Sequence, residues 1–307
     1  MTEPMPIKRR RAGVPAYGVL QRLASIPAAQ RPATRVLDVP AGPGVVTLPL
    51  ALAGFVAVGC DLFPETAQRV LDRLTPENLA QTLGSYWAAA HPPRLVAEIL
   101  ACPPPAPLPK PLFTQGDMTK PLPFPDDSFQ VAVCLEGIEH IDTVEGLIAE
   151  LRRVLVRGGL LLISTPNILC LRARVAYALA GQRTLSTFID EYTSIQARDG
   201  DRLYHGHVFL VDYFELRCLL HNHGFRIRAP LGTRLSWSSI LLAPLLLPWV
   251  ALATWLAPRR ARRKFRSMQG RGELPPQAAE PFGNILRHVL SPALLFGKNL
   301  LLEAEAV

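Results

Sequence analysis

The sequence predicts an α/β fold in which helices cover both faces of a doubly wound, mostly parallel sheet. Three observations carry this prediction. Residues 36–47 read as an apolar strand ending in an acid, a glycine turn and a helix start, and residues 56–62 read as a second apolar strand ending in an acid. Apolar residues then recur at helical spacing over 143–155, Gly158 and Gly159 are expected to stop this helix, and the apolar run 160–164 follows. Strands that alternate with helices in this way predict a ligand site at the carboxyl ends of parallel strands.

The glycine turn is the most informative feature. Gly42 and Gly44 remove side chains where a ligand approaches the backbone, and the N–H groups of the following helix favour an anionic group. Thr47 stands where a dinucleotide-binding turn has its third glycine, and Asp38 precedes the turn. A carboxylate there repels a pyrophosphate but attracts an ammonium group. S-adenosylmethionine has that ammonium, a cationic sulfonium and no phosphate, although the turn alone fits a generic nucleotide-binding turn equally well.

This segment resembles the first motif of class I S-adenosylmethionine-dependent methyltransferases, an acid-x-Gly-x-Gly-x-Gly pattern in which Pro40 here replaces the first glycine. The resemblance implies a Rossmann-like, seven-stranded sheet, mostly parallel with an antiparallel last strand. It also implies that the cofactor is S-adenosylmethionine. The cofactor contacts that it implies in this segment are Asp38, Ala41, Gly42 and Gly44.

The next two strand ends extend the resemblance. Asp61 lies 17 residues after Gly44, where doubly wound folds place an acid against ribose hydroxyls, and Leu62 follows it. Residues 112–118 resemble the third strand of the family, which implies that Asp117 accepts a hydrogen bond from the adenine amine while Met118 packs on the ring. Taken alone, Asp117 is better explained as a turn residue after Gly116.

Residues 122–140 resemble the fourth strand and end in Glu136, Glu139 and His140, which share a face if a helical turn follows the strand. The group resembles the Glu-x-x-Glu-His motif of quinone-biosynthesis O-methyltransferases, where it is associated with a divalent metal. We favour a place for Glu136 beside the cofactor over a metal site or helix capping, and assign no metal ligand.

His207 is the residue expected to act as a general base, because a histidine can take a proton from a hydroxyl near neutral pH. Glu139 and His140 are further catalytic candidates. For His207, a structural role in which it ties a loop to the sheet is at least as well supported by the sequence alone.

The net charge of +8 is concentrated in two clusters, at residues 8–11 and 259–266. These clusters hold ten cations, so the rest of the chain is close to neutral, which favours an anionic membrane surface over nucleic acid as a partner. The five cysteines are scattered and form no C-x-x-C pair, which fits a reducing cytosol. No signal peptide is expected, because no apolar run follows the basic start.

Residues 235–258 form an uncharged apolar stretch between segments that resemble the sixth strand (224–228) and the seventh strand (294–303) of the same sheet. Because both flanking strands belong to one sheet, we expect a shallow or re-entrant helical hairpin bent at Pro244 and Pro248, with Trp237, Trp249 and Trp255 at the interface. A buried helical lid over the substrate pocket is the alternative.

Four parts are therefore expected. They are a basic N-terminal segment and helix (1–32), a cofactor-binding methyltransferase domain (33–232), a hydrophobic and basic membrane-associating insertion with its linker (233–280), and a returning strand (281–307). The predicted function is O-methylation of a small or lipid-linked acceptor by a cytoplasmic enzyme at the inner membrane face, without nucleic acid. A nucleotide-dependent oxidoreductase or epimerase and a non-catalytic membrane-bound scaffold are the alternatives.

Overall fold

The computed structural model describes residues 14–86, 92–103, 107–182, 195–199, 202–206, 209–272 and 284–307. The chain divides into two compact units. The first holds residues 1–166, 189–233 and 301–307, and the second holds residues 167–188 and 234–300.

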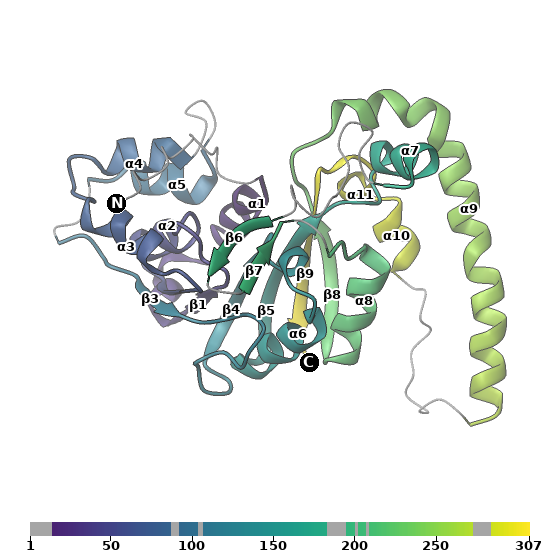
Figure 1. Ribbon diagram of the computed structural model, residues 1–307, viewed down its shortest axis with the longest axis horizontal. Helices are drawn as coiled ribbons and strands as arrows, with labels where there is room; N and C mark the ends of the chain where they lie inside the picture. Colours follow the sequence, from purple (N-terminus) through teal and green to yellow (C-terminus); the bar gives the residue numbers. More distant parts are fainter. Residues whose placement is uncertain are drawn as a thin grey trace. The chain divides into compact units, whose positions relative to one another are not determined.

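A seven-stranded sheet forms the first unit, in the order β3-β2-β1-β4-β5-β9-β8 (Figure 1). The β1–β2, β2–β3, β1–β4 and β4–β5 pairs are parallel, whereas β9 runs antiparallel to β8. The chain reverses its direction of progress through the sheet between β1 and β4, which is where ligands bind in doubly wound folds. The predicted fold class is confirmed. The strands are β1 (Arg35–Asp38), β2 (Val56–Asp61), β3 (Leu112–Gln115), β4 (Phe129–Leu135), β5 (Leu155–Pro166), β8 (Phe225–Leu231) and β9 (Asn299–Ala306).

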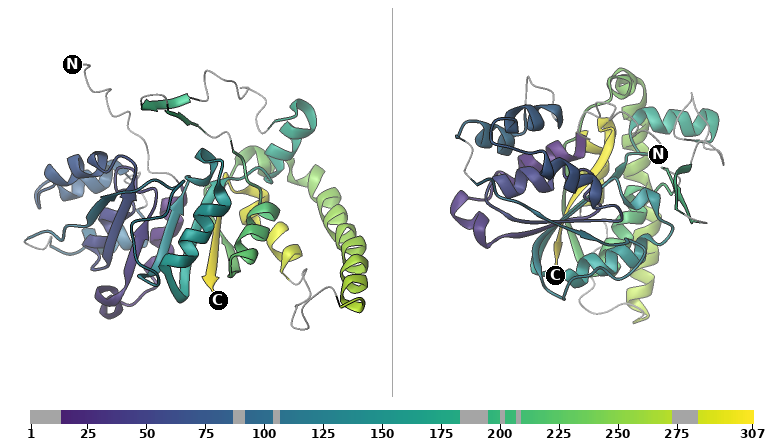
Figure 2. Two further views of the ribbon diagram at one scale, coloured as in Figure 1. Left: turned by 60° about the horizontal axis from the view of Figure 1, so that its bottom comes forward. Right: turned by 60° about the vertical axis from the view of Figure 1, so that its left-hand side comes forward.

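Helices cover both faces of this sheet (Figure 2). On one face, α5 (Arg94–Leu100) contacts both α1 (Val14–Leu23) and α2 (Thr47–Leu52), and on the other α6 (Val144–Val154) contacts α8 (Tyr213–Asn222). The core on the α1, α2 and α5 face includes Leu20, Val36, Leu50, Val133 and Leu301. The unit also contains the helices η1 (Ala28–Ala33), α3 (Glu65–Asp72), α4 (Leu79–Tyr86) and η2 (Ile138–His140), and an antiparallel pair β6 (Ile195–Asp199) and β7 (Arg202–His205).

The sequence misplaced two boundaries. Gly158 and Gly159 were expected to stop the helix, but α6 already ends at Val154 and both glycines lie inside β5. The register of β5 against β4 shifts there, and Gly158 has φ +77°. These glycines therefore allow the backbone of β5 to form an irregular, bulge-like segment. The last strand begins at Asn299, because residues 292–296 form the short helix α11 (Pro292–Phe296) that Ser291 caps.

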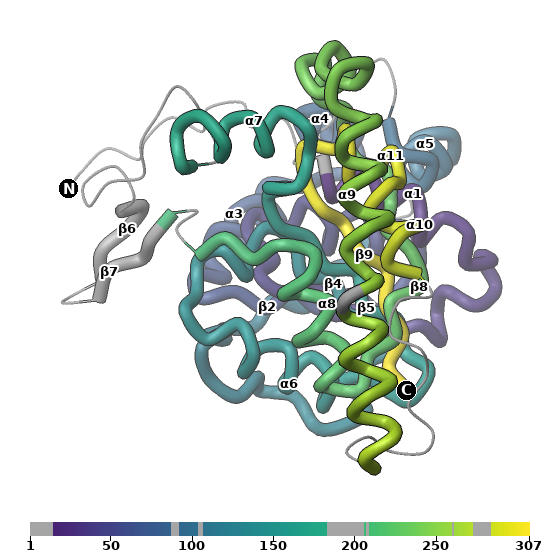
Figure 3. Tube along the Cα trace, turned by 90° about the vertical axis from the view of Figure 1, so that its right-hand side faces the viewer, coloured from purple at the N-terminus to yellow at the C-terminus, as the bar shows by residue number. Residues whose placement is uncertain are grey.

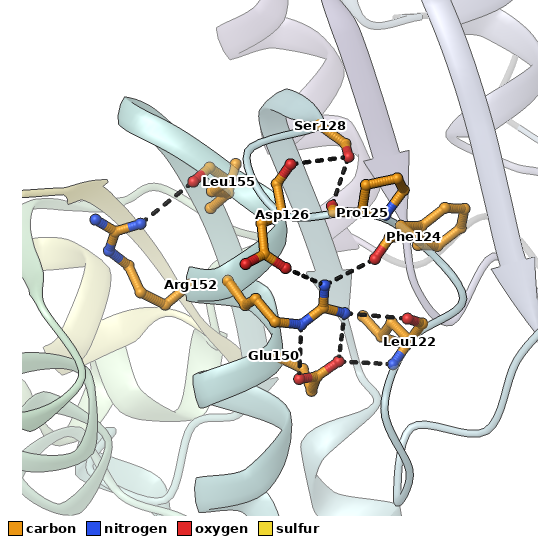
Figure 4. Close-up of polar contacts among 9 residues, drawn as sticks. Leu122, Phe124, Pro125, Asp126, Ser128, Glu150, Arg152 and Leu155 are labelled. Atoms are coloured by element: carbon orange, nitrogen blue, oxygen red, sulfur yellow. Dashed lines mark hydrogen bonds and ion pairs between the residues drawn. The ribbon is translucent and has the colours of Figure 1, made fainter.

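Arg153 of α6 anchors the loop between β3 and β4. Figure 4 labels its partners Leu122, Phe124, Asp126 and Glu150. Its guanidinium donates to the carbonyl oxygens of Leu122 and Phe124 and to the carboxylates of Glu150 and Asp126, over 2.7–3.0 Å. Glu150 also accepts the Leu122 N–H at 2.7 Å, and Arg153 holds the pKa of Glu150 below its usual range. This network fixes the path of the chain between the third strand end and β4.

The second unit contains α7 (Leu171–Ala180), α9 (Trp237–Gly270), α10 (Ile285–Val289) and α11, and α9 contacts each of the other three helices. The amide of Asn167 donates to the carbonyl oxygens of Leu294 and Gly297, which ties the chain before α7 to α11. Ser239 of α9 accepts the Arg172 N–H of α7 at 3.1 Å.

The predicted helical hairpin is wrong. Residues 237–270 form a single helix, which includes Pro244, Pro248 and Pro258. α9 bends in its first half and then runs straight (Figure 3). By length and composition it could cross a membrane, with a mean hydropathy of 2.0 over its most apolar window. None of that window is buried.

Candidate functional site

The glycine turn leaves β1 at the point where the strand order reverses. Gly42 and Gly44 have φ +52° and +77°, a backbone conformation that favours glycine. A Cβ on Gly42 would meet nothing within 4 Å, whereas one on Gly44 would lie 2.9 Å from the Phe113 ring. Gly42 therefore leaves open space above the turn, and Gly44 makes room for a neighbouring ring.

Asp38 lies beneath this turn. It is 3% exposed, and its Oδ2 accepts hydrogen bonds from the Thr47 hydroxyl at 2.6 Å and the Thr47 N–H at 3.2 Å. Burial raises the pKa of Asp38 to about 7, although the bonds from Thr47 act in the opposite direction. The threonine at the third-glycine position therefore has a structural use, since it connects the end of β1 to the first turn of α2.

Asp61, at the end of β2, accepts a hydrogen bond from the glycine turn. Its Oδ2 accepts the Gly42 N–H at 2.8 Å, and its Oδ1 accepts the Phe63 N–H at 2.9 Å. Ala41 donates its N–H to the Cys60 carbonyl at 3.0 Å. The backbone carbonyl of Leu62 accepts from the Gln115 amide, which links the second and third strand ends.

The third strand end is a tight turn built around Asp117. Its Oδ1 accepts the Thr119 N–H at 3.0 Å and the Thr119 hydroxyl at 2.7 Å, and its Oδ2 lies 3.8 Å from the Lys120 ammonium. This arrangement is the turn geometry that the sequence offered as the alternative role for Asp117. Met118 follows it and is half-buried.

Beyond β4, Glu136 has φ +49° and joins the end of β5. The Ser164 hydroxyl donates to Glu136 Oε1 at 2.9 Å, and the Glu136 N–H lies 3.2 Å from both Ser164 oxygens. Glu139 is fully buried and its carbonyl accepts the Phe209 N–H, whereas His140 is half-buried.

The described residues include no group of three or more His, Cys, Asp or Glu side chains that could hold a metal ion. Glu136, Glu139 and His140 are thus not arranged as one ligand set here. The helical turn that follows β4 is a short 3₁₀ turn that begins only at Ile138, after Glu136.

Three loops converge at Gly137. A Cβ on this glycine would lie 2.6 Å from Pro40 Cδ and 3.3 Å from Met118 Sδ. The first, third and fourth strand ends therefore meet within van der Waals distance at the carboxyl edge of the sheet. His207 lies outside the described residues, and for His205 only the backbone position at the end of β7 is described.

Sequence reasoning missed three residues that shape this edge. The Tyr86 hydroxyl of α4 donates to the Pro43 carbonyl at 3.2 Å. Phe113 covers Gly59, where an added Cβ would overlap the Phe113 ring, and Ser164 orients Glu136. No local signal identified Tyr86 or Phe113, whereas Ser164 lies at a predicted strand end.

A methyltransferase domain family model matches residues 8–229, most of the chain. A sterol 24-C-methyltransferase of Gibberella zeae is 46% identical over 48 residues, a match that spans 16% of this chain and 12% of that protein. The crystal structure of magnesium protoporphyrin IX methyltransferase from Synechocystis PCC 6803 with bound SAH has a TM-score of 0.47 at 16% identity, covering 95% of this chain and 82% of that one. An S-adenosylmethionine-dependent methyltransferase from Mesorhizobium loti has a TM-score of 0.45 at 13% identity, covering 95% and 98%.

The family model covers the glycine turn and every strand end described above, together with their acids. The chain therefore belongs to the methyltransferase domain family.

Proposed function

We propose that this enzyme methylates an oxygen of a small or lipid-linked acceptor at a membrane surface, with the cofactor held at the carboxyl edge of the sheet. The observation that supports the cofactor site most strongly is the meeting of Pro40, Met118 and Gly137 beside the open side of the Gly42 turn. When bound, S-adenosylmethionine supplies a methyl group on a cationic sulfur, which is already activated for transfer to a nucleophile.

The residues at this edge suit that cofactor. Each Asp61 oxygen accepts one backbone N–H, and a carboxylate has about four lone-pair sites, so Asp61 keeps capacity for two ribose hydroxyls. Glu136 is held by Ser164 at the end of β4 and would face the methionine end of the ligand, whose ammonium a carboxylate attracts. Met118 supplies a polarizable apolar contact for the adenine ring.

Asp38 supports this site indirectly. Its carboxylate is buried and accepts two hydrogen bonds from Thr47. We therefore propose that Asp38 fixes the glycine turn and the start of α2 in place. Ala41 and Gly44 are backbone parts of the same turn. Leu62 and Asp117 define the adjoining strand ends, where Asp117 orders the turn that presents Met118.

For the acceptor, we propose that a histidine takes the proton from the attacking hydroxyl. His140 is half-buried at the site, and His207 is the second candidate. Glu139 is fully buried, so we assign it a positioning role rather than direct contact with the acceptor. Alignment of the acceptor by the surrounding loops should supply most of the rate acceleration.

Titration calorimetry of the full chain with S-adenosylmethionine, S-adenosylhomocysteine and NAD tests the cofactor assignment. We expect Asp61→Ala to weaken binding of the first two by about 10- to 150-fold, the range for hydrogen bonds to a charged group. Asp72→Ala is the matched control, because Asp72 is exposed on α3 and accepts a hydrogen bond from Gln68 of the same helix. Equal affinity in wild type and a folded Asp61→Ala variant would contradict the ribose role.

The membrane part rests on residues 236–266, which join the exposed apolar part of α9 to the basic cluster. We propose that the enzyme is cytoplasmic and attached to the inner membrane face through this segment. The acceptor should then be found by mass spectrometry of membrane extracts from cells that lack or overproduce the protein, as pairs of species that differ by one methylene.

Carbon methylation is the second candidate, because the partial match is to an enzyme named for methylation at a carbon. The two reactions are distinguished by the product, since an O-methyl group and a C-methyl group differ in their NMR chemical shifts. A product methylated at carbon would replace the oxygen proposal without changing the cofactor site.

A further inference from the structure

The large apolar side chains of α9 that are most exposed all lie on one face of the helix. Successive residues in an α-helix are rotated by about 100°, which places these positions within an arc of about 120°. The exposed fractions run from 81% at Leu241 to 43% at Leu256. The face, called here the α9 apolar face, consists of Trp237, Leu241, Leu245, Trp249, Leu252, Trp255 and Leu256.

The rest of the helix circumference is covered more fully. Ser236 and Ser239 are buried, and residues 242, 243, 246, 247, 250, 251 and 254 are half-buried. α9 contacts α7, α10 and α11 within its own unit (Figure 3). The α9 apolar face is therefore the part of the helix that this packing leaves uncovered, and contiguous exposed apolar surface of this kind marks a binding site.

The α9 apolar face continues into positive charge along the same side of the helix. At the same rotation per residue, Arg259, Arg262, Arg263 and Arg266 fall within the arc or close to its edge, and all four are exposed. The Arg259 guanidinium stacks over the Trp255 ring, 3.7 Å from its centroid, which joins the apolar and cationic parts. Residues 237–272 contain no acidic residue. This charge favours an anionic partner and opposes a second copy of the same surface.

We infer that the α9 apolar face, with its four arginines, docks α9 on one side into the headgroup region of an anionic lipid bilayer, without crossing it. A helix that uses one face to pack on its own protein and the other to meet lipid lies in the interface, where tryptophan and arginine are favoured. The inference deepens the proposed function and rests on its membrane location. It names the contact face and the orientation of α9, and it replaces the expected hairpin.

The tryptophans make the orientation measurable. Trp237 and Trp255 are 18 residues apart, so they would lie about 27 Å apart along the axis only if α9 straightened, a length close to the hydrocarbon thickness of a bilayer. A spanning helix would place them at opposite interfaces with Trp249 nearer the bilayer centre. One-sided docking places all three at one shallow depth. Trp87 is the remaining tryptophan, so a Trp87→Phe background reports on α9 alone.

The experiment uses the full-length Trp87→Phe protein with vesicles of phosphatidylglycerol and phosphatidylcholine that carry bromine at shallow or deep acyl positions. We expect a blue shift and shallow quenching of all three tryptophans, and binding at least tenfold weaker to phosphatidylcholine alone. Replacing Leu241, Leu245 and Leu252 with serine should abolish insertion. Deep quenching of Trp249 with Trp237 and Trp255 at opposite leaflets would overturn one-sided docking.

A pair of single substitutions provides the matched control. Arg263→Gln removes a charge on the side of the α9 apolar face, whereas Lys264→Gln removes one from the opposite side of the helix. We expect about a fivefold loss of affinity at about 0.1 M salt for Arg263→Gln and less than half of that for Lys264→Gln, because the latter lies about one helix diameter, ~10 Å, further from the lipid, which is about one Debye length at this salt concentration. Equal losses, no vesicle binding, or a stable dimer that shields the tryptophans without vesicles would each overturn the inference.

Calorimetry with S-adenosylmethionine on the same proteins separates this inference from the proposed function. Vesicle binding by a protein that binds no cofactor would contradict the cofactor site alone. Cofactor binding and methyl transfer by a protein that does not bind vesicles would contradict the docking face alone.

Discussion

The carboxyl edge of the sheet holds polar groups that are buried or hydrogen-bonded, whereas helix α9 exposes large apolar side chains. At the sheet edge, a carboxylate is buried at Asp38 and satisfied by Thr47, and Asp61 and Glu136 are held by neighbouring donors. Along α9, tryptophan and leucine side chains are exposed by up to 81%. Hydrophobic burial stabilises most folds and polar burial opposes folding, so neither region is arranged for stability alone.

This difference separates two kinds of function. The polar groups at the sheet edge are positioned by hydrogen bonds within the fold, which prepares a site for a small ligand before the ligand arrives. The large apolar side chains of α9 are instead exposed in the part of the chain that the structure describes, so their arrangement is useful only when another surface covers them. Stability measurements should therefore respond strongly to changes at the sheet edge and weakly to changes on the α9 apolar face.

The largest effect is expected from the pH dependence of Asp38. Its pKa is about 7 in the fold and 3.8 in the reference state, so between about pH 4 and pH 7 the native protein binds more protons than the unfolded chain. The free energy of unfolding should therefore fall as the pH rises through this window, by on the order of 4 kcal/mol. The measurement is urea unfolding without added cofactor across this pH range. The quantity to compare is the difference in the free energy of unfolding between wild type and Asp38→Asn. A pH-independent difference would show that Asp38 is ionised as easily in the fold as in the unfolded chain.

Gly59→Ala tests how closely the sheet edge is packed. The added Cβ would overlap the Phe113 ring and lie 2.9 Å from Ala41 Cβ, so overpacking should cost about 1–3 kcal/mol. Thermal unfolding measures the loss. In a Phe113→Leu background, Gly59→Ala should lower the melting temperature by less than it does in wild type. An equal loss in both backgrounds would contradict contact between the added Cβ and the Phe113 ring.

Ser239→Val tests the covered side of α9. The Ser239 hydroxyl accepts the Arg172 N–H, so its removal should cost about 1–2 kcal/mol. Hydrogen exchange at the first turn of α7 measures the local effect, and we expect faster exchange there than in wild type. Ser238→Val is a control on the exposed side, and similar exchange in both variants would argue against this α7 to α9 bond.

Leu241→Gln should have the smallest effect on stability. Leu241 is 81% exposed, so the free energy of unfolding in solution should change by no more than about 0.5 kcal/mol. Urea unfolding in the absence of lipid provides this value. A loss of about 2 kcal/mol or more, the scale of burying one leucine side chain, would mean that the protein itself covers this face.

The sequence predicted much of the site because its signals are local. Apolar runs that end in Asp38 and Asp61, and the glycines between them, specify strands and a turn within a few residues. Parallel strands share one carboxyl edge, so the acids could be placed together without knowing any long-range contact. The same locality explains the errors at Gly158 and Gly159, where a helix stop and a strand irregularity have the same composition.

The sequence by itself determined the order of strands and helices, the glycine turn, the acids at the strand ends and the joining of an apolar stretch to a basic cluster. Only the tertiary structure decided that the Thr47 hydroxyl donates to Asp38, that the Ser164 hydroxyl donates to Glu136 and that Phe113 packs over Gly59. It also decided which side of α9 stays exposed, because α7, α10 and α11 cover the other. The physical reason is that periodicity shows which residues share a face, whereas packing between elements distant in sequence decides which partner that face meets.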